Sequence, residues 1–220
     1  MAKKIITAAE AAKLVPNGST VMFGGFMGCG NPHNIVDELL AQGVKDITMI
    51  CNDTAIPDFG VGKLVIAKRI KKLIATHIGL NPQTGIQMNS GEMEVELIPQ
   101  GTMAERIRAG GAGLGGFLTP TGVGTPVEEG KKRMTIDGVD YLLELPLRAN
   151  IALINAKKAD KAGNLIYNFS ANNFNQTMAT AADLVIAEVE EIVEEGQLDP
   201  NTIHTQGVFV DYLVKKSCPR

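Results

Sequence analysis

Short apolar runs alternate with segments of helical periodicity through the first half of the chain. After the first run, Ile35, Val36 and Leu39 are spaced so that they share one face of a helix. Strands that alternate with helices at this spacing favour parallel pairing, with helices on the faces of the sheet. The predicted strands of this half are residues 20–23, 47–51, 73–78 and 93–98.

Two pairs of side chains have the spacing of a capping box, in which a hydroxyl and a carboxylate three residues apart close the start of a helix. Thr7 and Glu10 predict a short helix over residues 7–14. Thr102 and Glu105 predict a second helix that opens at Thr102.

The second half has a different pattern. Asp137-Gly138 predicts a hairpin turn, and a turn at Gly163-Asn164 separates two further apolar runs. We therefore expect an α/β fold with a mixed, largely parallel central sheet and flanking helices, formed by residues 1–220 as one domain. The predicted elements of this half are strands at 150–155, 165–169 and 184–189 and a helix at 173–182.

A glycine-rich loop follows the first predicted strand. It contains Gly24, Gly25, Gly28 and Gly30, and we expect Asn31 to cap the next helix with Pro32 at its first position. Such a loop can bring backbone N–H groups and a helix start close to a phosphate or pyrophosphate. Its spacing is neither that of a dinucleotide-binding fingerprint nor that of a P-loop. A tight strand-to-helix turn is the alternative interpretation.

Composition and charge exclude several classes of protein. The net charge of −3 gives no basic footprint, so nucleic acid is not an expected partner. Residues 14–36 carry no charge, but glycines and prolines interrupt them, so they predict no membrane helix. The N-terminus lacks a secretory pattern. Three cysteines without a close pair, namely Cys29, Cys51 and Cys218, favour a reducing cytoplasm.

The remaining polar residues predict little chemistry by themselves. Cys29 and His33 are two possible metal ligands without a third at metal spacing, so no metal site is expected. Glu92, Glu94 and Glu96 alternate along a strand, and we interpret them as a solvated face, as we do the acidic run at 188–195. The charge-free stretch 109–127 contains seven glycines and scattered apolar residues. We expect it to pack at a site or at a subunit interface.

Residues 17–32, with Gly24-Gly25-Phe26 at their centre, resemble the signature at the start of the A (alpha) subunit of family I CoA-transferases. The chain most resembles the subunits of the acetate, acetoacetate and butyrate (3-oxoacid) kind. Further matching segments follow in the same order, and they are Asn52-Asp53-Thr54, Ile98-Pro99-Gln100-Gly101-Thr102, 105–113, 119–122, 162–165 and Asn173-Phe174-Asn175.

The resemblance implies an activity and a division of labour. CoA would move between a short-chain acyl-CoA or 3-oxoacyl-CoA and a free carboxylate such as acetate, through an enzyme–CoA thioester on a glutamate. In this family the glutamate belongs to a Ser-Glu-Asn-Gly motif of the B (beta) subunit, and this chain has no such motif. The resemblance therefore implies a beta-subunit partner, in a hetero-oligomer such as a heterotetramer.

The resemblance also implies site residues. The side chain of Gln100 and the backbone of Gly101 would stabilise the oxyanion of each acyl transfer, although Gln100 could instead cap a turn. CoA would bind as a substrate, with no tightly bound cofactor, and its phosphates or the substrate carboxylate could meet Arg106, Arg108, Arg148, Lys157 or Lys158. The expected CoA-binding residues are Gly24, Gly25, Phe26, Met27, Gly28, Cys29 and Gly30.

Two other functions fit parts of the pattern. The CoA-transferase architecture is distantly shared with sugar-phosphate isomerases, and an isomerase would use the glycine loop for phosphate and Asp53 as its carboxylate base. A non-catalytic module that binds CoA or a nucleotide is the third possibility.

Overall fold

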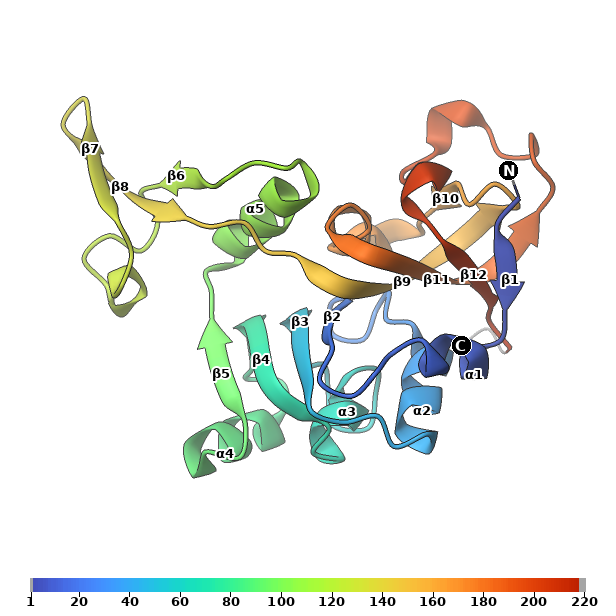
Figure 1. The fold of residues 1–220 in the computed structure, drawn as a ribbon, viewed down its shortest axis with the longest axis horizontal. Coiled ribbons are helices and arrows are strands. Elements are labelled where there is room, and N and C mark those ends of the chain that lie inside the picture. The colour runs from blue at the N-terminus through green and yellow to red at the C-terminus, as the bar shows by residue number, and fades with distance from the viewer. Residues whose placement is uncertain (1, 218–220) are drawn as a thin grey trace.

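The computed structural model describes residues 2–217, so Cys218 lies outside the described residues. Nine strands form the main sheet (Figure 1), in the spatial order β1-β12-β11-β9-β2-β3-β4-β5 with β10 beside β9. The strands are β1 (Lys4–Ile6), β2 (Thr20–Phe23), β3 (Ile47–Asp53), β4 (Ile70–His77), β5 (Glu94–Leu97), β9 (Ala149–Asp160), β10 (Leu165–Ile166), β11 (Ala182–Val193) and β12 (Tyr212–Lys215). Each neighbouring pair is parallel except β10 with β9, which confirms the largely parallel, mixed sheet.

Helices cover both faces of this sheet, as Figure 1 shows with α1–α4 below and α5 above. The helices are α1 (Ala8–Lys13), α2 (His33–Ala41), α3 (Gly62–Ile66), α4 (Pro82–Ser90), α5 (Gln100–Gly111) and α6 (Asn175–Met178). In β2, Val21 and Phe23 pack in the core between the sheet and α1, α2 and α3, whereas Met22 packs in the core with α5 and α6. Burial on both faces explains why the central strands are continuous apolar runs.

A second, antiparallel sheet forms an arm that projects from the body at the left of Figure 1. It consists of β6 (Phe117–Thr119), β8 (Val139–Glu144) and β7 (Arg133–Ile136), in that order. Positive φ angles of 50° at Asp137 and 78° at Gly138 confirm the predicted hairpin turn. Short 3-10 helices complete the secondary structure at Pro126–Glu128, Phe169–Asn172, Pro200–Thr202 and Gly207–Phe209.

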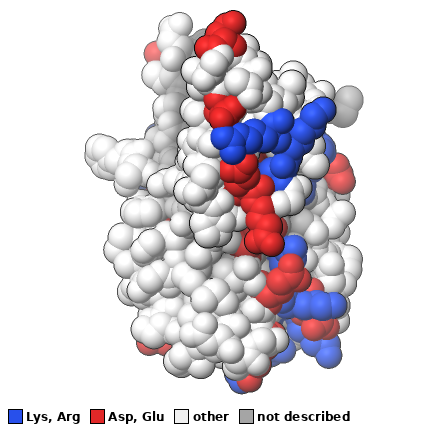
Figure 2. All heavy atoms as spheres, turned by 90° about the vertical axis from the view of Figure 1, so that its left-hand side faces the viewer, with Lys and Arg blue, Asp and Glu red and all other residues white. Residues whose placement is uncertain are grey.

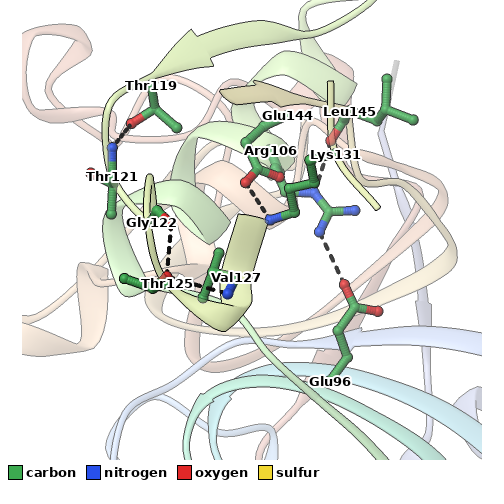
Figure 3. Close-up of polar contacts among 10 residues, drawn as sticks. All are labelled: Glu96, Arg106, Thr119, Thr121, Gly122, Thr125, Val127, Lys131, Glu144 and Leu145. Carbon is green, nitrogen blue, oxygen red and sulfur yellow. Dashed lines mark hydrogen bonds and ion pairs between the residues drawn. The ribbon is translucent and has the colours of Figure 1, made fainter. Parts of the chain in front are cut away.

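Polar contacts fix the root of this arm on the body (Figure 3). Nε of Arg106 donates to the Leu145 carbonyl at 2.8 Å, and its guanidinium pairs with Glu96 at 3.1 Å. The glycine-rich stretch 109–127 continues α5, enters β6 and closes a turn in which the hydroxyl of Thr125 donates to the Gly122 carbonyl. This stretch is therefore the ordered base of the arm.

Three sequence predictions of helix boundaries were wrong. Helix α2 begins at His33 after Pro32, because the side chain of Asn31 is used elsewhere. Helix α5 begins at Gln100, and the hydroxyl of Thr102 is buried without a partner, so no capping box forms there. Helix α6 ends at Met178, because residues from Ala182 onward pair with β9 as β11. The box of Thr7 and Glu10 at α1 is confirmed.

Candidate functional site

The glycine loop leaves the sheet at the point where the strand order reverses. From β2 the chain proceeds to β3, β4 and β5 on one side, whereas β9, β11 and β12 lie on the other. In open parallel sheets, ligands bind at the carboxyl ends of the strands beside such a reversal. The loop that follows β2 therefore occupies the position where a site is expected.

Residues 26–29 of this loop form a miniature hairpin. The N–H of Phe26 donates to the Cys29 carbonyl at 2.9 Å, and the N–H of Cys29 donates to the Phe26 carbonyl at 2.8 Å. Positive φ angles of 50° at Met27 and 81° at Gly28 give the two-residue turn. Phe26 and Met27 remain 42% and 46% exposed, so the hairpin presents an apolar tip.

Buried side chains hold this hairpin in place. The carboxylate of Asp53 accepts the N–H of Met27 at 2.9 Å and that of Ala55 at 2.7 Å. The amide of Asn31 donates to the Gly24 carbonyl and accepts the N–H of Val61. Because both side chains are buried, the loop is fixed from its inner side.

The segment Asn173-Phe174-Asn175 holds the hairpin from the opposite side. Asn173 accepts the N–H of Gly25 at 3.1 Å, and the amide of Asn175 donates to the Gly30 carbonyl at 3.1 Å. The same Asn175 accepts the N–H of Asn155 at 3.0 Å. The glycine loop and the segment 173–175 both match the family pattern and lie far apart in sequence, and these hydrogen bonds join them in the folded chain.

Most backbone N–H groups of the glycine loop are bonded within the chain. The N–H groups of Gly24, Gly25 and Met27 all donate to acceptors of this chain, as do those of Phe26 and Cys29. Within residues 24–30, the N–H groups of Gly28 and Gly30 have no acceptor in the described part of the chain. The loop is thus a rigid wall with two available donors.

Two adjoining cavities lie between the hairpin and the start of α5. Their volumes are about 430 and about 370 Å³. Both are lined by Phe26, Asn52 and Gln100, and neither is lined by Lys, Arg, Asp or Glu. The other lining residues are Ala104, Ser170, Asn173, Phe174 and Thr177 in the first cavity and Met27, Thr76, His77 and Leu80 in the second.

Gln100 is the first residue of α5, and its exposed side chain borders both cavities. The first N–H bonded within the helix is that of Met103, so the amides of Gln100 and Gly101 precede the bonded turn. Pro99 precedes the helix and no side chain caps it, so Gln100 does not serve as a cap. Its side-chain amide is available as a donor to a group in the cavity.

A third cavity, of about 380 Å³, lies on the other side of the hairpin. It contains Gly28, Cys29 and Gly30 of the expected CoA-binding set, together with Met27, which also lines the second cavity. Gly24, Gly25 and Gly101 line none of the three cavities. The other residues that line this third cavity are Asn31, His33, Phe59, Asn155, Lys157, Asn168, Phe169, Ser170, Ala171, Glu190 and Lys216.

Sequence patterns did not single out Asn155 or Lys216. Asn155 lies in the middle of β9 and Lys216 directly follows β12. The fold brings them together over a long sequence distance, and neither belongs to a local motif. Burial raises the pKa of Glu188, which lies opposite Asn155 in the register of β11 and β9, to about 6, so this member of the acidic run is not solvated. Burial lowers the pKa of His33, and nearby Lys216 adds to that shift.

The acidic residues of β5 are paired with cations rather than gathered for acid–base chemistry. Lys72 contacts Glu94 at 2.7 Å and Glu96 at 3.7 Å, and Arg106 also contacts Glu96. Figure 2 shows that acidic and basic side chains on this side of the molecule lie together in one band, and much of the remaining surface in that view is uncharged.

No group of three or more His, Cys, Asp or Glu side chains is placed to hold a metal ion within residues 2–217. Among the described helices, none combines the length and apolar character needed to cross a membrane. Cys29 is exposed and Cys51 is buried, and burial raises the pKa of the Cys51 thiol well above its usual range.

The fold corresponds to that of a known family of transferases. The chain belongs to the coenzyme A transferase family, whose profile matches residues 5–216. Within that family it is an alpha subunit. It is 54% identical to the acetate CoA-transferase subunit alpha of Escherichia coli K12, over 97% of each chain. It is 48% identical to the acetoacetyl-CoA:acetate/butyrate CoA transferase alpha subunit of Clostridium acetobutylicum, over 98% of this chain and 99% of that one.

Solved structures confirm the architecture. An acyl-CoA transferase from E. coli O157:H7, as a thioester complex with CoA, superposes with a TM-score of 0.88 at 20% identity, over 100% of this chain and 48% of that chain. The glutaconate coenzyme A-transferase of Acidaminococcus fermentans gives a TM-score of 0.82 at 20% identity, over 96% of this chain and 75% of that chain. At these identities the likeness concerns the fold.

Proposed function

We propose that this chain supplies the oxyanion-stabilising side of an active site that moves CoA between a short-chain acyl-CoA or 3-oxoacyl-CoA and a free carboxylate such as acetate. The observation that carries the proposal is the amide of Gln100 at the wall of a cavity without a carboxylate. A transfer through an acyl-enzyme needs both an oxyanion donor and a carboxylate nucleophile. The nucleophile therefore comes from a beta subunit that carries Ser-Glu-Asn-Gly.

The proposed reaction has two halves with the same electrostatic requirement. The partner's glutamate attacks the thioester carbonyl and expels the CoA thiolate. The acyl group and the glutamate then form a mixed anhydride. The thiolate then attacks the glutamyl carbonyl of the anhydride, which releases the first carboxylate and leaves CoA on the enzyme as a thioester. The acceptor carboxylate reverses these steps. Each attack forms an oxyanion, to which the side-chain amide of Gln100 and the amide of Gly101 would donate.

The isomerase alternative is disfavoured by the environment of Asp53. Its carboxylate is 3% exposed and accepts N–H groups of Met27 and Ala55. A general base must reach a substrate proton, whereas this carboxylate holds the hairpin. A non-catalytic CoA-binding module would share the cavities, and turnover by the assembled complex distinguishes it.

The test is to purify this chain alone, the beta subunit alone and the co-expressed complex, and to assay CoA transfer from acetoacetyl-CoA to acetate. Turnover is expected from the complex alone, with the CoA thioester on a peptide of the beta subunit by mass spectrometry. Steady turnover by this chain without a partner would refute the proposal, and a complex without turnover would favour the binding module.

The same preparation tests the assembly. We propose an alpha/beta hetero-oligomer such as a heterotetramer that works in the reducing cytoplasm, where Cys29 and Cys51 stay free as the structure has them. Light scattering should give the mass of two copies of each subunit. The mass of this chain alone, without the beta subunit, would contradict that assembly.

A further inference from the structure

The cavity behind the hairpin differs from the two in front of it by its charge. Two lysines and one glutamate line it, whereas no Lys, Arg, Asp or Glu lines the cavities around Gln100. Lys157 comes from β9, Glu190 from β11, and Lys216 follows the end of β12. These strands are parallel neighbours, and their register places the three charged residues beside one another.

The other basic residues that the sequence offered for phosphate recognition are engaged elsewhere. Arg106 bonds Glu96 and the Leu145 carbonyl, and Arg148 bonds Asp183 and the Gly110 carbonyl. Arg108 pairs with Glu105, and Lys158 pairs with Glu191. None of these four lines the cavities beside the hairpin, whereas Lys157 does.

Donors without partners surround the same cavity. Asn155 is 7% exposed, and its side-chain Nδ2 has no partner among the described residues. The amides of Gly28 and Gly30 are available, as described above. Buried donors normally find an acceptor. An unfilled set of donors beside two ammonium groups indicates a ligand that accepts several hydrogen bonds.

Two carboxylates limit how strongly such a ligand is held. Glu190 lies 2.6 Å from Nζ of Lys157 and 3.8 Å from Nζ of Lys216, so it competes for both. Glu188 accepts the N–H of Ile35 through one oxygen, and its other oxygen has no partner among the described residues. It lies opposite Asn155 in the register of β11 and β9. The lining residues still carry one more ammonium than carboxylate.

We propose that this cavity is an oxyanion site of the phosphate class, held by Lys157, Lys216 and the amide of Asn155. Its volume of about 380 Å³ exceeds that of one phosphate group. A phosphate of CoA and free inorganic phosphate are two sources of the same chemistry. Binding of a CoA phosphate rests on the proposed function, whereas binding of inorganic phosphate does not.

The decisive experiment titrates the assembled alpha/beta complex with inorganic phosphate by calorimetry. Lys157→Met keeps the length of the side chain and removes its charge, and it should weaken phosphate binding about tenfold. Lys158→Met is the matched control, because Lys158 is the next residue of β9 and has an equivalent pair with Glu191. It should leave the affinity unchanged, and Glu190→Gln should increase it.

Folding does not obscure this comparison. Lys216 is 8% exposed, so Lys216→Met can fail to fold, whereas the side chain of Lys157 is 43% exposed and tolerates replacement. The titration needs no turnover, so a failure of the proposed function leaves it readable. Absence of phosphate binding by the wild-type complex, or equal affinities in Lys157→Met and Lys158→Met, would overturn the proposal.

Kinetics then assign the source of the phosphate. If a CoA phosphate occupies the cavity, Lys157→Met raises KM for an acyl-CoA about tenfold and leaves KM for the acyl-pantetheine, which lacks every phosphate, unchanged. If free phosphate is the occupant, both KM values stay unchanged while the calorimetric affinity still falls. Either kinetic result supports the site, provided that Lys157→Met has weakened phosphate binding in the calorimetric titration.

Discussion

Oδ1 of Asn175 lies 1.7 Å from the point that a Cβ on Gly24 would occupy. The same oxygen accepts the N–H of Asn155, and the N–H of Gly24 donates to the Leu153 carbonyl. One buried amide therefore joins α6, β9 and the glycine loop. The glycine is required by the packing of the chain against itself, before any ligand is considered.

This contact predicts a large loss of stability in Gly24→Ala. The new methyl group would displace Asn175 and break its bonds to Asn155 and Gly30, which overpacks the core and leaves buried polar groups unpaired. We expect the free energy of unfolding to fall by about 3 kcal/mol in urea denaturation. Gly85→Ala is the control, because nothing lies within 4 Å of a Cβ at that position in α4. It should be neutral or stabilising by up to about 1 kcal/mol. Equal stabilities in the two variants would show that Asn175 adapts freely.

A second prediction concerns the pH dependence of stability at Glu188. Burial raises its pKa from 4.5 to about 6. The folded state therefore binds the proton more tightly than the unfolded state, and this contribution to stability is lost as pH rises through about 6. Glu188→Gln does not ionise and keeps an oxygen for the N–H of Ile35. From pH 4 to pH 7.5 the variant should gain about 2 kcal/mol relative to the wild type.

The comparison with the wild type isolates Glu188 from its charged neighbours. Lys216, Asp37 and His33 are present in both proteins. The pKa of His33 is lowered by burial, so its own contribution runs in the opposite direction and cancels in the difference. A difference in unfolding free energy that stays constant between pH 4 and pH 7.5 would contradict the prediction.

The uncharged lining of the cavities at Gln100 predicts a preference among acids. A second carboxylate, as in succinate, would be buried without a counter-ion from this chain. The assembled enzyme should favour butyrate over succinate by at least about tenfold in kcat/KM. Ala104→Lys, one turn after Gln100, should narrow that ratio, whereas Ala104→Met should not. Equal use of the two acids by the wild type would mean that the partner supplies the cation.

The central strands could be predicted because burial on two faces leaves a continuous apolar signature, as in Thr20–Phe23. Strand β1, at one edge of the sheet, and its neighbour β12 were missed, since Lys4–Ile6 and Tyr212–Lys215 are short and carry no such run. Asn31 shows where local rules fail. Its sequence context is that of a helix cap, but its side chain bonds Gly24 and Val61.

The candidate site was predicted in part. The family resemblance indicated Gln100, and the structure places it beside Phe26 of the glycine loop. The resemblance could not indicate that Asn175 fills the space beside Gly24, because that contact depends on the packing of distant segments. Lys216 was missed for the same reason, as it reaches the cavity from the far end of the chain.

The most direct test of the account is the single-turnover rate of enzyme–CoA thioester formation in Gln100→Ala, measured in the assembled complex. Its side chain is exposed and caps nothing, so the melting temperature should stay unchanged. Gln83→Ala, in the first turn of α4 and outside the three cavities, is the control. If Gln100 donates to the oxyanion, the rate should fall about 10²–10³-fold while acyl-CoA affinity changes little. A folded Gln100→Ala complex that forms the thioester at the wild-type rate would contradict the account.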